Sequence, residues 1–236
     1  SRCTMQKHRL AAVVLAFVAS SAHGSDQEIS WRGFDDVRAA IETHDVTSLN
    51  HLLKLLPAEF RTNYVLMTKT ESSHLATELR PRVIMMNEDA RLILAFSGAL
   101  NDPNYEVLEM IEFNDESRFV MHEIKFPRRL NAPAEFSEAN PSRCLDCHGA
   151  NPRPNWEPDL AWPGAVGQSE TPTDRELNTL HRFAVRRSPR YAALEAHDNR
   201  KLVEKSDETC ASLLATRINK LNARRIAQMI VATPDY

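Results

Sequence analysis

The stretch Cys144-Leu145-Asp146-Cys147-His148 constrains this chain more than any other part of its sequence. Two cysteines three positions apart, followed directly by a histidine, occur in three kinds of site: covalent haem attachment, half of a zinc site, or a dithiol redox pair. In the first kind, the sulfurs reach two neighbouring vinyl groups of the porphyrin and the imidazole lies under the iron. The rest of the sequence has to decide among the three.

Residues 1–24 indicate export. A basic stretch after Met5 leads into an apolar run over residues 10–19 and then into small residues, which is the pattern of a secretory signal peptide. Small residues allow cleavage after Ala22 or Gly24. The apolar run is about half the length of a membrane span, so we expect no stable span after cleavage. The expected product is soluble and lies in the periplasm or elsewhere outside the cytoplasm.

Composition and cysteine content exclude several classes of protein. The chain has 236 residues, of which 42% are hydrophobic and 26% charged, as in ordinary globular proteins. After residue 24 it carries 26 basic and 32 acidic side chains, so it lacks the excess of positive charge that nucleic-acid binding requires. Of the four cysteines, Cys3 precedes the predicted cleavage site, so the mature chain has only Cys210 besides the motif, as a buried apolar side chain or a free thiol, and no disulfide framework is expected.

The pentapeptide resembles the haem attachment site of c-type cytochromes, which in bacteria receive their haem outside the cytoplasmic membrane. Further matches are Gly149, Asn-Pro-Arg-Pro-x-Trp at 151–156, Trp-Pro-Gly at 162–164 and Arg-Tyr at 190–191. With them the chain resembles exported bacterial cytochrome c domain-containing proteins with a single haem, over about residues 80 to 235. The resemblance implies one covalent haem c on Cys144 and Cys147, with His148 as the proximal iron ligand. It brings no established activity, and zinc becomes the less favoured interpretation.

Hydrophobic periodicity predicts an α+β domain over residues 25–130. Apolar residues at steps of three and four predict helices over 31–43 and 49–56, the second capped by Asp45, Thr47 or Ser48. Two runs over 82–86 and 92–96 flank a polar break at 87–89, as in a hairpin, and alternation over 105–113 leads through a polar turn into 119–126. Together these four strands predict a four-stranded antiparallel sheet.

Residues 131–236 are expected to form a mainly helical, haem-binding region that differs from the common small cytochrome c fold. The segment 127–143 is irregular and contains proline, where small cytochromes c have a helix leading into the motif. Helices are expected over 176–184, near 191–197 and over 213–230.

Four large side chains near the motif have two interpretations each. Trp156 and Trp162 either cover the porphyrin edge or anchor their proline-rich loop to the protein. Arg143 and Arg153 either pair with the haem propionates or remain solvated.

The chemistry depends on the sixth iron ligand. Small cytochromes c place a methionine some tens of residues after the motif, but the only downstream methionine, Met229, lies in a predicted core helix. Histidines are therefore preferred, with His181 as the first candidate for the distal metal ligand. The others are His197, His122 and Met121, and an open position is also compatible with the sequence.

Three functions follow from these alternatives. A closed, six-coordinate iron predicts a periplasmic carrier of single electrons that works with a redox partner protein. An open iron with a nearby base and an arginine, among Arg186, Arg187 and Arg190, predicts a haem enzyme of the peroxidase type. A haem-based redox or gas sensor, which would act through a partner, is the third. We favour the electron carrier over a catalyst.

Overall fold

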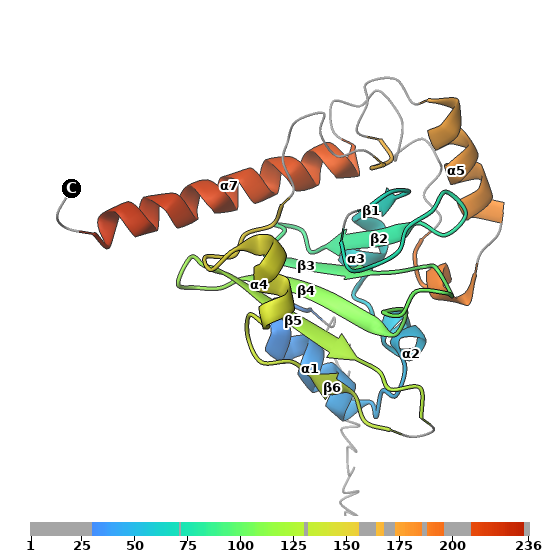
Figure 1. Ribbon diagram of the computed structural model, residues 1–236, viewed down its shortest axis with the longest axis horizontal. Coiled ribbons are helices and arrows are strands. Elements are labelled where there is room, and N and C mark those ends of the chain that lie inside the picture. Colours follow the sequence, from blue (N-terminus) through green and yellow to red (C-terminus); the bar gives the residue numbers. More distant parts are fainter. Residues whose placement is uncertain are drawn as a thin grey trace, which may run out of the picture.

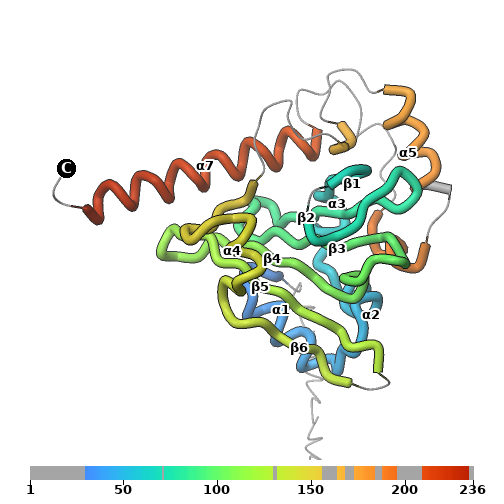
Figure 2. The backbone as a smooth tube through the Cα atoms, in the orientation of Figure 1, coloured from blue at the N-terminus to red at the C-terminus, as the bar shows by residue number. Residues whose placement is uncertain are grey.

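A six-stranded antiparallel sheet forms the centre of the protein. The computed structural model describes residues 30–70, 72–129, 132–155, 164–167, 173–185, 188–195 and 209–233. Each strand pairs with its neighbours in sequence, in the order β1-β2-β3-β4-β5-β6, as the tube in Figure 2 shows. The strands are β1 (Tyr64–Met67), β2 (Arg82–Met86), β3 (Leu92–Phe96), β4 (Val107–Phe113), β5 (Phe119–Lys125) and β6 (Glu135–Phe136).

The predicted α+β class is confirmed, but the prediction of four strands is wrong. The four expected strands are β2 to β5, and the structure adds one strand at each edge. β1 is buried at all four positions, so it lacks the alternation that marks a half-exposed strand. β6 has only two residues, which is too short for any pattern.

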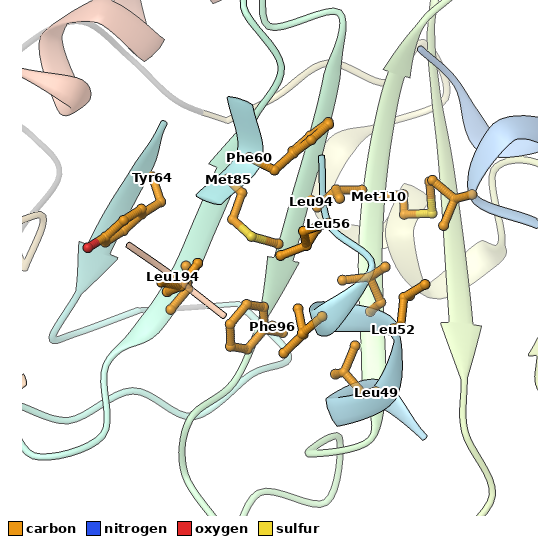
Figure 3. Packing of buried hydrophobic residues seen from close by; sticks show 14 of the residues in the cluster. Leu49, Leu52, Leu56, Phe60, Tyr64, Met85, Leu94, Phe96, Met110 and Leu194 are labelled. Carbon is orange, nitrogen blue, oxygen red and sulfur yellow. The ribbon is translucent and has the colours of Figure 1, made fainter. Parts of the chain in front are cut away.

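Three helices cover one face of the sheet, here called the inner face. They are α1 (Phe34–Thr43), α2 (Leu49–Lys54) and α3 (Ala58–Thr62). Leucines of α2 and Phe60 of α3 pack against Met85, Leu94, Phe96 and Met110 of the strands (Figure 3). The helix predicted over 31–43 is confirmed as α1. The helix predicted over 49–56 is confirmed as α2, and Ser48 accepts a hydrogen bond from the amide of His51 as its N-cap.

The other face of the sheet, here called the motif face, is covered by α4 (Ser142–His148) and α7 (Cys210–Val231). Five apolar residues of α7 are buried there: Ala211, Leu214, Ala215, Ile218 and Leu221. In Figure 1, α7 runs along the upper left of the sheet, and α4 lies beneath α7, beside β4 and β5. Because alternate residues of a strand face opposite sides, both faces of β2 and β3 are buried, at all five positions of each strand.

The remaining described elements are α5 (Asp174–Val185) and the 3-10 turn η1 (Pro189–Tyr191). The hydroxyl of Tyr191 donates to the carbonyl of Pro81 at 2.8 Å, and the buried Arg190 pairs with Glu106 at 2.9 Å. The helices predicted over 176–184 and 213–230 are confirmed as α5 and α7. The described segments 132–155, 173–185, 188–195 and 209–233 thus pack with the strands in one structure.

Some predictions lie outside the described residues: the signal peptide over 1–24, Trp156, Trp162, Arg186, Arg187 and His197. Within the part of the chain that the structure describes, no helix combines the length and apolar character needed to span a membrane.

Candidate cofactor site

The Cys144-x-x-Cys147-His148 motif forms the short helix α4, which begins at Ser142, at the end of the segment 127–143 that we expected to be irregular. Pro141 precedes the helix with extended backbone (ψ 146°), and its carbonyl accepts from the amide of Cys144 at 2.8 Å. Gly149 ends the helix with a φ of 78°, a conformation that glycine adopts without strain. Residues spaced by three and four lie on one side of a helix, so both thiols and the imidazole share a side.

The chain that follows α4 folds back and holds the motif. The carbonyl oxygen of Arg153 lies 2.6 Å from Nδ1 of His148, and the side-chain amide of Asn155 donates to the carbonyl of Cys147 at 3.1 Å. A carbonyl only accepts hydrogen bonds, so Nδ1 must carry the proton of the neutral imidazole. The lone pair is therefore on Nε2, which is the state required of a histidine that ligates a metal through that atom.

A cavity of about 640 Å³ lies between α4, α7 and the motif face of the sheet. Its volume falls in the range of roughly 300 to 1,000 Å³ that is usual for cofactor and ligand sites. Cys144, Cys147 and His148 all line it. Its apolar lining comes from the sheet and α7: Met67, Ile84, Ile93, Ala95, Ile111, Met121, Leu214 and Ile218.

The register of the sheet explains the floor of this cavity. On neighbouring strands, Ile84 is paired with Ala95, Ala95 with Glu109, and Glu109 with Glu123. The next row is Met86, Ile93, Ile111 and Met121. Side chains in such rows point to the same face, so apolar groups meet a pair of carboxylates under α4.

Each of the two carboxylates is neutralised by an arginine. Nη2 of Arg82 lies 2.5 Å from Oε2 of Glu109, and Nε of Arg143 pairs with Oε1 of Glu123. Burial by itself would raise the pKa of Glu109. Arg82, His74 and a hydrogen bond from Ser73 outweigh this effect and lower the pKa to about 2. The floor of the cavity therefore carries two ion pairs and no net charge from them.

His74 lies next to Glu109, one of the two carboxylates of this floor. Its side chain is fully buried, and its Nδ1 is 3.4 Å from Oε2 of Glu109. Burial lowers the pKa of His74, although the nearby carboxylate opposes this effect. The imidazole is therefore neutral at pH 7 and takes no charge into the protein interior.

Cys144 and Cys147 are not joined in a disulfide. Burial raises the pKa of Cys144 to about 12, and Glu123, whose carboxylate lies 3.7 Å from Sγ, adds to this effect. Reactive and metal-binding thiolates need a lowered pKa, so this environment disfavours a dithiol redox pair. Among the described residues, no group of three or more histidine, cysteine, aspartate or glutamate side chains is placed to hold a metal ion. A zinc site at the motif thus lacks further ligands in this part of the chain.

The structure separates the candidates for the distal ligand. His181 is exposed on α5 and does not line the cavity. His122 borders the cavity, but its ring stacks on Phe34 of α1 with centroids 3.9 Å apart, so the imidazole lies on the inner face. Met121 is 1% exposed and lies on the motif face beside Ile111.

Sequence reasoning missed Met67, Arg82 and Glu109. Met67 lines the cavity from β1 and is 1% exposed, yet it precedes Cys144 by 77 residues, whereas small cytochromes c place their methionine ligand after the motif. Arg82 and Glu109 are polar residues within predicted strands, and nothing in the sequence indicates that they pair with each other. No sequence signal connects these three residues to the motif, because the sheet register alone brings them there.

The arginines singled out from the sequence have other partners here. Arg143 lines the cavity beside Cys144 but pairs with Glu123, and Arg153 is exposed and contributes its carbonyl to His148. Arg190 is completely buried, 3.8 Å from the ring of Tyr105, and pairs with Glu106. Arg190 therefore helps to hold η1 against the sheet.

Comparison of the chain with protein-family models, with curated proteins and with solved structures finds no match. The site must therefore be interpreted from its own geometry.

Proposed function

We propose that this chain is a c-type cytochrome that carries one covalently attached haem in the cavity beside α4 and transfers single electrons. The observation that carries the proposal is the contact between Nδ1 of His148 and the Arg153 carbonyl, which leaves Nε2 free to ligate iron. This histidine and both cysteines line one cavity of about 640 Å³ whose lining is largely apolar. These residues fit a porphyrin, which is flat, apolar and needs two thiols for covalent attachment.

The residues of the motif have separate roles in holding haem. The Sγ atoms of Cys144 and Cys147 would each bond to one carbon of a vinyl group, and the thiol hydrogen would go to the other vinyl carbon, so the addition would consume no oxidant or reductant. Nε2 of His148 would hold the iron, and the Arg153 carbonyl, which accepts a hydrogen bond from Nδ1, orients the ring and increases its basicity.

The lining of the cavity determines what the iron can do. Bound haem supplies a one-electron couple between two oxidation states of iron. The apolar floor of Ile84, Ile93 and Ile111 excludes water and penalises the more highly charged, oxidised state, which raises the reduction potential. The ion pairs of Glu109 and Glu123 hold their charges in place without adding net charge to the floor.

For the sixth ligand, we infer a methionine of the motif face in place of His181. Met121 and Met67 are both buried side chains on the motif face that line the cavity. A thioether is a soft ligand that stabilises reduced haem iron and closes the site to other ligands. This ligation suits an electron carrier.

Haem attachment is tested by expressing the chain together with a c-type maturation system. We expect covalent haem that survives acid-acetone extraction in the parent chain and in Cys210→Ala, the matched control. The double variant Cys144→Ala/Cys147→Ala should lose it. Extractable haem in the parent, or none, would refute the proposal.

The axial ligands are tested by visible spectra of oxidised and reduced protein, with and without carbon monoxide. His148→Ala should change the spectrum and open the site to carbon monoxide. Loss of the methionine-to-iron charge-transfer band in Met121→Leu or in Met67→Leu would identify the sixth ligand. If neither substitution alters the spectrum, the methionine assignment is wrong.

One observation favours a second candidate, a haem enzyme of the peroxidase type. Arg82 and Glu109 line the cavity and provide a guanidinium and a carboxylate of the kind that assists cleavage of an O–O bond. This function requires an open iron. A shift of the reduced spectrum by carbon monoxide in the parent chain, together with turnover of hydrogen peroxide that Arg82→Met abolishes, would favour the enzyme over the carrier.

A further inference from the structure

Helix α7 has a charge opposite to that of the rest of the protein. Its 22 residues include Arg217, Lys220, Arg224 and Arg225 and no acidic residue. The remainder of the chain after residue 24 contains 22 basic and 32 acidic side chains. A basic helix on an acidic protein creates a local positive potential that attracts acidic partners.

The last two turns of α7 also expose apolar side chains. Ile226, Met229, Ile230 and Val231 are 47%, 49%, 65% and 79% exposed. In Figures 1 and 2 this end of the helix projects beyond the edge of the sheet, whereas its first half packs on the strands. The end of the helix therefore exposes apolar side chains, and the basic Lys220 and Arg224 lie within about three turns of them along the helix. We call these four residues, with Lys220 and Arg224, the α7 patch.

The α7 patch is continuous with the motif. The side-chain amide of Asn151, three residues after His148, lies 3.3 Å from Sδ of Met229. Burial lowers the pKa of Arg225, and the nearby positive charge of Arg153 adds to the effect. The segment that holds His148 thus lies against the C-terminal half of α7, and Cys147 is itself exposed.

We propose that the α7 patch is the docking surface for an acidic redox protein, which exchanges electrons with the haem across the exposed Cys147 side of the motif. This inference rests on the proposed haem function. The basic side chains would steer the partner, and the apolar group would exclude water at the contact. A lipid surface is less suited to this helix, because Leu214 and Leu221 are buried against the sheet and only the last two turns expose apolar side chains.

The test uses stopped-flow mixing of the reduced holoprotein with oxidised plastocyanin, an acidic copper protein, and with a basic cytochrome c. One electron leaves the reduced protein and converts Cu(II) to Cu(I). For plastocyanin we expect a rate that falls as ionic strength rises, and the basic cytochrome c should be reduced more slowly at low salt. The double variant Lys220→Glu/Arg224→Glu should slow plastocyanin reduction about tenfold or more at low salt.

Lys54→Glu is the matched control, because Lys54 is an exposed lysine of α2, on the inner face of the sheet. Its effect should remain below about twofold, since the charge lies far from the docking surface. Equal slowing by the control and the double variant, or a rate independent of salt, would overturn the proposal. Circular dichroism and the haem content of each variant exclude misfolding as the cause.

A second measurement distinguishes the occupants and does not need haem. Amide chemical shifts of the ¹⁵N-labelled protein, titrated with plastocyanin, should change at the end of α7 and around Asn151. Shifts confined to other elements would overturn the docking site. Co-sedimentation with phosphatidylglycerol vesicles, or a dimer lost in Ile226→Ser/Ile230→Ser, would instead assign the patch to a membrane or to a second copy. Failure of the haem function itself appears separately, as the absence of covalent haem.

Discussion

Replacing Glu109 by glutamine removes the charge at the centre of the cavity floor while keeping the shape of the side chain. In the parent chain this carboxyl has a pKa of about 2, against an ordinary 4.5. A shift of this size corresponds to about 3 kcal/mol of native-state stabilisation of the ionised form. The variant also leaves the guanidinium of Arg82 without its charge partner at a side chain that is 11% exposed. We therefore expect Glu109→Gln to lower the free energy of unfolding at pH 7 by about 3 kcal/mol.

The sign of the pH dependence follows from the lowered pKa. The stabilisation is fully present above about pH 4.5 and is lost as the pH falls towards 2, where the native carboxyl becomes protonated. Urea unfolding followed by circular dichroism at pH 7 and near pH 2.5 measures both ends of this range. The difference between parent and variant should be large at pH 7 and should shrink at low pH.

Asp115→Asn is the control for this experiment. Asp115 pairs with Arg91 at 2.7 Å, but its side chain is 99% exposed, so solvent screens the pair and the substitution should have little effect. If Glu109→Gln costs no more than this control, or costs the same at both pH values, the reasoning about the buried ion pair is wrong.

Three further substitutions test other parts of the structure. Glu123→Gln should lower the pKa of the Cys144 thiol by removing a neighbouring negative charge, so iodoacetamide should alkylate this thiol faster at pH 9 in haem-free protein. Gly98→Ala should destabilise the fold by at least about 2 kcal/mol, because its Cβ would lie 1.5 Å from the hydroxyl oxygen of Tyr191; thermal unfolding measures the loss, and an unchanged Tm would contradict it. Ser48→Ala should cost about 1 kcal/mol in urea unfolding by removing the N-cap of α2.

Much of the fold was predictable because local signals agree with it. The periods of 3.6 and 2 located α1, α2, α5, α7, β4 and β5, which are only partly buried. The polar break at 87–89 between two apolar runs located β2 and β3, although both faces of these strands are buried. β1 escaped prediction because it has only four residues, all buried, and no short turn joins it to β2; α4 escaped because it has only seven residues and no buried side chain. Hydrophobic periodicity cannot mark an element that buries everything or nothing.

By itself, the sequence determined the chemistry offered by Cys144, Cys147 and His148, because the spacing of two thiols and an imidazole along the chain is a local property. Only the tertiary structure decided what surrounds these three groups. The register of β2 to β5 places Ile84, Ala95, Glu109 and Glu123 in one row beneath the motif, although 39 residues separate the first of them from the last. The formation of strand β5 also separates His122 from Met121, because adjacent residues of a strand point to opposite faces of the sheet. The cavity depends on how distant strands pair, and no local pattern in the chain records that pairing.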